Sequence, residues 1–391
     1  MAGSIKPVAG KKNHWEIRYD SEDVNGNRTQ HKRRFKGNKS EAIKYLTQLQ
    51  AQIINGEYTG KIGEVKVRDY LEKWEQEYCK SNLAYKTNES YSSIIRLYLK
   101  PELGGIKMCN LKAGHIQSYY TKMLKINKLS GTSVLYHHRI LHEALRHAVN
   151  LGYIPFNPCD RVKPPRKNKP EMQILSLEQA KYVLENCKSE KAYLPVMLAI
   201  QTGMRLGEIC GLRWKDIDLE TGKINICNSL QRQNGELVLK DVKTSKSRRS
   251  IPVSSDVISE LKKVLLKCKQ DKLSFRTYDI RGFVCCWEDG RPFDTKWVSK
   301  QWVGVITNDK NRSVIDNTER NIPDGVRFHD LRHTHASILL SQGISLKVVQ
   351  ERLGHESITT TGDIYSHVSP SMQKEAVEVL GSIFAYQIKA M

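Results

Sequence analysis

The sequence predicts a mainly α-helical protein of several domains that also contains small β-sheets. Its 391 residues are too many for one ordinary hydrophobic core and suit two or three domains. Long segments place apolar residues at three- and four-residue steps, as helices do, whereas residues 14–35 and 223–253 alternate apolar with polar residues, as half-buried strands do. We expect a β-sheet-plus-helix domain at 1–62, a helical bundle at 63–160, a linker at 161–173, and a mixed α/β domain at 174–391 that ends in a helix.

The N-terminal part is expected to form a hairpin followed by a helix. Residues 15–19 alternate apolar and polar side chains, Asn25 and Gly26 provide a turn, and a second strand runs over 29–35. Ser40 is expected to cap the helix that follows.

The second of these strands is basic. With Arg18 of the first strand, Lys32 and Arg34 should share the face opposite Phe35, because side chains alternate along a strand. We expect these three cations to contact DNA, since a strand pair can enter a major groove. The alternative is a solvated sheet face.

Residues 66–152 are expected to form a bundle of roughly four helices. Thr87 should cap the second helix, and Thr132 or Ser133 should start the last one, which Gly152 stops.

Four histidines fall on the last of these helices. Their spacing is irregular and no acidic or cysteine residue is near, so we interpret them as surface residues on the DNA side rather than metal ligands. They are His137, His138, His142 and His147.

The linker is expected to be a stiff, extended and positively charged strap, because two adjacent prolines are followed by cations. It can be a solvated hinge, or it can cross a phosphate backbone between two domains. In the second case Lys163, Arg166 and Lys167 would contact DNA.

The C-terminal part should begin with a capping box formed by Ser176 and Gln179. A strand-rich insert is expected at 223–253, and helices again from residue 329 onward. In the tail, apolar residues at helical spacing over 371–384 predict a helix, which we expect to dock on a neighbouring copy of the chain.

The charge of the chain favours a polyanionic partner. Lys and Arg total 63 against 42 Asp and Glu, a formal net charge of +21. The excess is densest at 66–170, with 19 basic against 8 acidic residues, which suits contact with a DNA backbone. The alternative is a charge that serves only solubility.

The cysteines indicate a reducing compartment, because there are nine and none forms a CxxC pair. No run approaches the roughly 18 apolar residues of a membrane-spanning helix, and the start lacks a signal-peptide pattern. We therefore expect a cytoplasmic protein that does not enter a membrane.

Chemically informative residues gather in short motifs. His329 and Arg332 lie in a His-x-x-Arg-His segment, His355 ends a Leu-Gly-His segment, and Tyr365 follows ten residues later. Upstream, Arg205 lies in a Thr-Gly-x-Arg-x-x-Glu segment.

Together these residue types suit the breakage of a phosphodiester, which needs a nucleophile, cations on the phosphate and an acid for the leaving hydroxyl. The phenol of Tyr365 can attack phosphorus and later leave. The guanidinium groups of Arg205 and Arg332 match phosphate oxygens. Each residue alone is weak evidence, whereas the combination predicts DNA strand breakage and rejoining.

Further residues can move protons in such a reaction. Lys243 follows a predicted strand and can reach a leaving 5′ oxygen, although Lys246 is also a plausible acid. His329 and His355 can exchange protons near neutral pH. Glu208 is interpreted as a structural partner of the arginine that precedes it.

These segments resemble the tyrosine recombinases of the integrase type, found in temperate phages and integrative mobile elements. The helical bundle is similar to the core-binding domain of that family, and the N-terminal part resembles its arm-type DNA-binding domain. The matching segments are 202–208, the Lys243-Thr244 pair with the later Arg-x-Ile-Pro at 249–252, 329–333, 353–355, and Tyr365 with its following x-His-Val.

The resemblance implies a site-specific recombinase that integrates and excises a mobile element through a 3′-phosphotyrosine. In that mechanism Tyr365 attacks the phosphate, Lys243 protonates the leaving group and His329 handles the proton of the tyrosine. The residues that hold the phosphate are Arg205, Arg332 and His355.

The resemblance also implies partners and a location. These are double-stranded DNA with core and arm sites, further copies of the chain in a tetramer joined through the C-terminal helix, an excisionase, and a DNA-bending host protein. No cofactor and no metal are implied, and the location is the cytoplasm of a bacterial host, at the nucleoid.

Two other functions stay open. A type IB topoisomerase uses the same chemistry without site preference, but the two domains upstream of the catalytic part argue against it. A DNA-binding regulator with an inactive site is opposed by the full set of six catalytic residue types.

Overall fold

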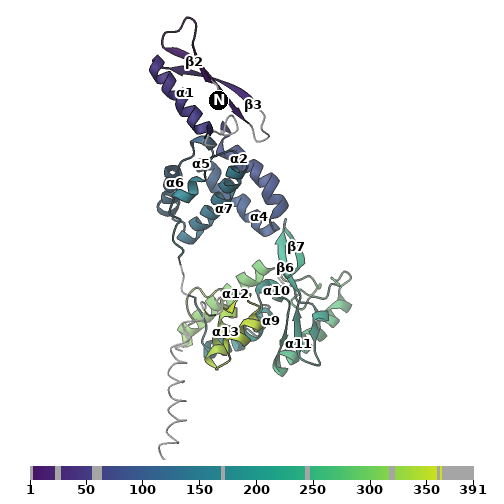
Figure 1. Ribbon diagram of the computed structural model, residues 1–391. Helices are drawn as coiled ribbons and strands as arrows, with labels where there is room; N and C mark the ends of the chain where they lie inside the picture. The colour runs from purple at the N-terminus through teal and green to yellow at the C-terminus, as the bar shows by residue number, and fades with distance from the viewer. Residues whose placement is uncertain are drawn as a thin grey trace, which may run out of the picture. The chain divides into compact units, whose positions relative to one another are not determined.

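The computed structural model describes residues 3–22, 28–54, 64–168, 172–242, 247–316, 322–358 and 362. The chain divides into two compact units, Met1–Pro170 and Glu171–Met391 (Figure 1). Helices dominate both units, and the strands form small antiparallel sheets, so the predicted fold class is confirmed. Within the described residues, no helix has the length and apolar character to cross a membrane.

A three-stranded sheet with one helix against it forms the N-terminal part (Figure 1). Its strands β1 (Gly3–Pro7), β2 (His14–Glu22) and β3 (Arg28–Lys36) pair in that order. The small core lies between β2 and α1 (Lys39–Ile54), where Ile17 and Tyr19 are buried. The strand β1 was not predicted, because an exposed edge strand of five residues has no clear alternation of its own.

The helix α1 is capped by Asn38 and not by Ser40, which lies inside its first turn. The backbone N–H of Glu41 donates to Asn38 Oδ1 (2.8 Å), and the backbone N–H of Asn38 donates to Glu41 Oε2 (2.9 Å). This reciprocal pair satisfies two backbone donors and decides where the helix begins.

The second part of this unit is a helical bundle around one core. Ser130 accepts a hydrogen bond from the backbone of Ser133 and caps the long last helix, which begins at Gly131, one and two residues before the expected starts Thr132 and Ser133. Thr87 likewise lies inside a helix that begins two residues earlier. The elements are α2 (Val67–Trp74), η2 (Glu75–Cys79), α3 (Lys80–Asn82), α4 (Tyr85–Ile94), η3 (Ile95–Leu99), α5 (Lys100–Leu103), η4 (Met108–Asn110), α6 (Ala113–Lys125), α7 (Gly131–Asn150) and η5 (Pro158–Arg161).

His137 of α7 serves the packing of the bundle, which corrects its interpretation as a surface residue. His137 is only 3% exposed, and its Nδ1 lies 2.8 Å from the hydroxyl of Tyr119. Burial lowers the pKa of His137 to about 4, so the ring is neutral at neutral pH. The other three also bond within the bundle: His138 to Tyr120, His142 to Asp160, and His147 to Trp74.

The chain that follows η5 is extended and lies against the start of α7. The backbone N–H of Asn168 donates to Thr132 Oγ1 (3.1 Å). A Cβ on Gly131 would collide with the carbonyl oxygen of Arg166, so the close approach requires a glycine there. The predicted DNA contacts Lys163, Arg166 and Lys167 are exposed on this strap.

The second unit combines helices with a three-stranded sheet, β4-β5-β8, and a two-stranded hairpin, β6-β7. Ser176 accepts from the backbone of Gln179, and the side chain of Gln179 bonds back, which confirms the predicted capping box. The elements are α8 (Leu177–Asn186), α9 (Tyr193–Thr202), α10 (Leu206–Cys210), η6 (Trp214–Asp216), β4 (Ile217–Asp218), β5 (Lys223–Ile226), β6 (Asn228–Gln233), β7 (Glu236–Asp241), β8 (Arg249–Pro252), α11 (Ser255–Ser274), α12 (Thr295–Asp316), α13 (Asp330–Ser341) and α14 (Leu346–Leu353).

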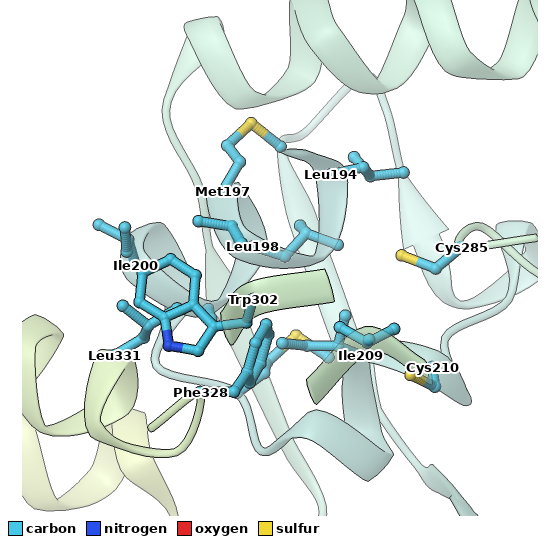
Figure 2. Packing of buried hydrophobic residues seen from close by; sticks show 14 of the residues in the cluster. Leu194, Met197, Leu198, Ile200, Ile209, Cys210, Cys285, Trp302, Phe328 and Leu331 are labelled. Carbon is cyan, nitrogen blue, oxygen red and sulfur yellow. The ribbon is translucent and has the colours of Figure 1, made fainter. Parts of the chain in front are cut away.

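Trp302 of α12 lies at the centre of the core of this unit (Figure 2). Its side chain is fully buried, its ring meets that of Phe328 edge-on, and its indole N–H donates to the carbonyl of Val326 (2.9 Å). Leu198 of α9 and Leu331 of α13 are buried in the same cluster. This core therefore holds the start of α13 beside the end of α9.

Candidate active site

The predicted catalytic motifs of the second unit lie at the ends of helices. Arg205 directly precedes α10, His329 directly precedes α13, and Arg332 lies in the first turn of α13. Gly354 ends α14 in the left-handed conformation (φ 67°), and His355 follows it. Because α13 packs on both α9 and α14, these ends come together.

Arg332 joins the other two motifs. Its guanidinium group, in a side chain only 2% exposed, donates from Nη1 to the carbonyl of Gly203 and from Nη2 to the carbonyl of Leu353, both at 2.6 Å. Gly203 has a φ of 67°, and a Cβ there would collide with His335 and Leu353. The turn beside Arg332 therefore requires a glycine.

Glu208 holds the side chain and the backbone of Arg205 in place. Its Nη1 donates to Glu208 Oε1 (2.8 Å), and its backbone N–H donates to Glu208 Oε2 (2.9 Å). Its Nη2 lies 3.5 Å from the carbonyl oxygen of Gly354. The side chain of Arg205 keeps 37% of its surface exposed, so a phosphate can reach it.

Glu208 also binds Arg249 of β8, which the sequence analysis did not select as a site residue. Arg249 donates from Nη2 to Glu208 Oε2 (2.9 Å) and from Nε to the carbonyl of Arg352 (2.8 Å), and the two side chains are 7% and 3% exposed. Burial alone would raise the pKa of Glu208, but the two guanidinium groups hold it below its usual value. The alternation of side chains along a strand could have identified Arg249. It lies two residues before the buried Ile251, so both side chains are on the inward face of β8.

The imidazoles of this region are neutral at neutral pH. Burial, followed by the charges of Arg332 and Arg205, lowers the pKa of His355 to about 4. The pKa of His329 is also lowered, first by desolvation and then by Arg332. His333 meets His329 edge-on, with ring centroids 5.2 Å apart, and burial lowers its pKa to about 4.

His335 is a second residue that the sequence analysis missed. Its Nδ1 lies 2.7 Å from the carbonyl oxygen of Ile200, and Arg352 Nε donates to its Nε2 (3.1 Å). A neutral, buried imidazole thus ties α13 to α9 and α14. No sequence signal separated this histidine from its neighbours, because its role depends on partners from distant segments.

The structure brings together five of the seven residues predicted for catalysis and its support: Arg205, Glu208, His329, Arg332 and His355. The predicted acid Lys243, its alternative Lys246, the predicted nucleophile Tyr365 and the tail at 371–384 lie outside the described residues.

The predicted DNA contacts of the N-terminal sheet lie in register. Arg18 pairs with Lys32 across the strands, and Arg34 pairs with Glu16, so the three cations share one face. Glu16 accepts from Arg18 (2.8 Å) on that face. Phe35 packs on the opposite face, with the core.

Comparison with known proteins identifies the class. The sequence model of the phage integrase family matches residues 173–372, and that of the N-terminal SAM-like domain of phage integrases matches residues 66–124. The chain therefore belongs to the phage integrase family and is a site-specific recombinase of the tyrosine type.

Individual relatives extend along most of the chain. A tyrosine recombinase XerC-like protein of Caldanaerobacter subterraneus subsp. tengcongensis is 30% identical over 341 residues, which cover 82% of this chain and 84% of that protein. The integrase of Staphylococcus phage L54a is 25% identical over 352 residues, which cover 84% of this chain and 96% of that protein.

Solved structures share the fold. The Tn1549 transposon integrase in complex with transposon right end DNA superimposes with a TM-score of 0.68 at 22% identity, covering 81% of this chain and 99% of that one. A lambda integrase tetramer bound to a Holliday junction superimposes with a TM-score of 0.58 at 18% identity, covering 92% of this chain and 96% of that one.

We predict that Arg249→Met lowers the rate of DNA cleavage at saturating DNA by about 10- to 100-fold, because a small misplacement of a catalytic group is costly. Arg249→Lys should recover part of the rate, since it restores the charge but not the planar fork. Single-turnover cleavage of a labelled duplex measures the rate, and circular dichroism shows that the variants are folded.

The matched control for this prediction is the neighbouring Arg248, which is exposed and pairs with Asp241 (2.6 Å) on the surface. Arg248→Met should cleave like the parent protein. Equal rates for folded Arg249→Met and Arg248→Met would show that Arg249 does not position the site.

Proposed function

We propose that this chain is the integrase of a mobile element, which cleaves and rejoins DNA through a 3′-phosphotyrosyl intermediate. The observation that supports this most is the convergence of Arg205, Arg332 and two neutral histidines in a member of the phage integrase family. Integration and excision of the element are the outcomes of the strand exchange.

The two arginines suit the binding of the scissile phosphate. Planar guanidinium groups can bond two non-bridging oxygens at once and stay charged at any working pH. The hydrogen bonds of Arg332 to two backbone carbonyls, and of Arg205 to Glu208, orient both groups before DNA arrives. Preorganised donors of this kind lower the barrier because they need not rearrange during the reaction.

In the proposed reaction the phenol oxygen of Tyr365 forms a bond to phosphorus, and the bond from phosphorus to the 5′ oxygen breaks. His329 accepts the proton of the tyrosine, Lys243 donates a proton to the 5′ oxygen, and His355 bonds the phosphate. The 5′ hydroxyl of a partner duplex then reverses the step. The ester retains the bond energy, so no ATP is required.

The lowered pKa of His329 determines in which direction the rate of DNA cleavage should change with pH. The ring stays in its basic, proton-accepting form to a pH below the usual histidine range near 6.5. Cleavage that depends on this base should therefore be retained at neutral pH and be lost as the pH falls through the lowered pKa.

We further propose roles for the parts of the chain. Residues 1–62 would bind arm-type DNA sites, and residues 63–160 and 174–391 would each bind the core site. The strap at 161–173 would contact the DNA backbone through Lys163, Arg166 and Lys167. The partners would include an excisionase and a DNA-bending host protein, in the cytoplasm of a bacterial host at the nucleoid.

Assembly is proposed as a tetramer on DNA, joined by the helix at 371–384. Deletion of 371–391 should then leave binding of a single site intact and abolish the tetramer, as measured by size-exclusion chromatography with light scattering on DNA. A tetramer of the deleted protein would exclude this role for the tail.

The proposed function predicts a covalent adduct in EDTA. Purified protein would be incubated with nicked, labelled duplexes tiled from the DNA beside its own gene. The parent should give an adduct that survives denaturant, and Tyr365→Phe should give none while binding DNA normally. An adduct in Tyr365→Phe would place the nucleophile elsewhere, and relaxation of any supercoiled plasmid would favour a type IB topoisomerase.

The same assay separates the two candidate acids. A 5′-bridging phosphorothioate provides a leaving group that needs no proton, because a thiolate is stable near neutral pH. The variant that lacks the acid should be slow on the normal duplex and fast on the sulfur duplex. We expect this pattern for Lys243→Ala and not for Lys246→Ala, and the reverse pattern would reassign the acid.

We also predict that replacing Arg18, Lys32 and Arg34 with alanine weakens arm-site binding at least tenfold, because each lost phosphate or base contact removes affinity. Core-site cleavage should change little. Fluorescence anisotropy with separate arm and core duplexes measures both.

The control for this triple variant replaces Lys11, Lys39 and Lys44, which are exposed cations outside the basic face, and so removes the same charge. Its arm-site affinity should fall much less. Equal losses in the two triple variants, or equal losses at arm and core sites, would exclude the basic face as the arm-binding surface.

A further inference from the structure

A pair of thiols lines a cavity of the second unit that shares no residue with the arginine and histidine cluster. The cavity has a volume of about 400 Å³, and its lining includes Cys268 of α11 and Cys286 of the segment after Phe283. The two sulfur atoms are 3.9 Å apart and in hydrogen-bonding contact. Neither cysteine is in a disulfide, and both are only partly buried.

The neighbouring cysteine, Cys285, does not belong to this thiol pair. Cys285 is fully buried and points into the hydrophobic core with Leu194 (Figure 2). Burial raises the pKa of the Cys285 thiol well above its usual value, so it is unreactive. Cys286, the next residue, is only partly buried and lines the cavity instead.

The two thiols of the pair differ in acidity. The contact with Cys286 lowers the pKa of Cys268, against the opposing effects of burial and of Asp271, and the nearby Trp214 and Lys267 add to the lowering. The pKa of Cys286 is raised by its partner and by burial. The Trp214 N–H is buried and makes no hydrogen bond among the described residues.

We propose that Cys268 and Cys286 form an oxidation site that closes to an intramolecular disulfide when a peroxide enters the cavity. The Cys268 thiolate attacks one oxygen of hydrogen peroxide, which gives the sulfenic acid and hydroxide. The Cys286 sulfur then displaces hydroxide from the sulfenic sulfur, losing its proton to form water. Two thiols and one peroxide thus become one disulfide and two water molecules.

The geometry favours closure of the bond with little movement of the backbone. A disulfide needs its sulfurs about 2 Å apart, and side-chain rotation can close the remaining distance. Both cysteines lie on anchored segments: Cys268 is inside a long helix, and Cys286 pairs with Pro292 across a short bridge. The lining of the cavity is charged and carries both signs: four lysines, Lys188, Lys191, Lys263 and Lys267, and three acidic residues, Glu190, Asp271 and Glu288.

The test uses the full-length protein with hydrogen peroxide as the oxidant, followed by denaturation and alkylation with iodoacetamide. Oxidised protein should lose the mass of two hydrogen atoms and take up two fewer alkyl groups than reduced protein. Peptide mapping should join the peptide of Cys268 to that of Cys286. Cys286→Ser should not form the link and should accumulate a sulfenic acid at Cys268 that dimedone traps.

Two controls make the result specific. Cys109→Ser removes an exposed cysteine of the other unit and should leave the disulfide unchanged. Trp214→Phe keeps the aromatic packing but removes the N–H, and should slow alkylation of Cys268 in the folded protein by about tenfold, since the thiolate is the nucleophile.

The proposal is overturned if peroxide oxidises Cys109 before any link between Cys268 and Cys286 appears. It is also overturned if folded Cys268 and Cys109 react with iodoacetamide at the same rate. Neither result bears on the recombination chemistry, because the thiol pair does not depend on the proposed function.

Discussion

The buried carboxylate of Glu208, held between two guanidinium groups, is the interaction on which the catalytic unit depends. Removing a carboxylate from water costs several kcal/mol, and the cost is offset only when its oxygens are fully bonded. Arg205, Arg249 and the backbone N–H of Arg205 supply those bonds. Because Arg249 also donates to the carbonyl of Arg352, one carboxylate links the turn before α10, the strand β8 and the end of α14.

The electrostatic state of the site follows from this arrangement. Arginines in a poorly solvated pocket make further positive charge unfavourable, so His329 and His355 are held neutral. Among the described residues the positive charge of the site comes from its guanidinium groups, while the imidazoles can still accept protons. Such a division of roles suits an anionic phosphodiester that must also exchange protons.

Successive side chains of a strand point to opposite faces, so one face can pack against the core while the other carries charged residues. Lys32 and Arg34 lie on one face of β3, and Phe35 packs on the other. Arg249 shows the converse case, because it occupies the inward face of β8 and so requires the buried partner that Glu208 provides.

The sequence by itself determined the fold class, the catalytic motifs and the caps that depend on local pairs. The capping box at Ser176 was predicted correctly because its partner Gln179 is three residues away. The caps at Ser40 and Thr87 were wrong, because several nearby residues can begin a helix; α1 is capped by Asn38, through another local pair with Glu41, and α4 begins two residues before Thr87.

Only the tertiary structure decided the roles that depend on distant partners. His137 was assigned to the surface, yet it is buried against Tyr119 of another helix. The pairing of Arg249 with Glu208 and the contact of Cys268 with Cys286 likewise join separate elements. Local sequence fixes which face a residue occupies, but the charge or hydrogen bond that it meets there comes from whichever segment the hydrophobic core places opposite it.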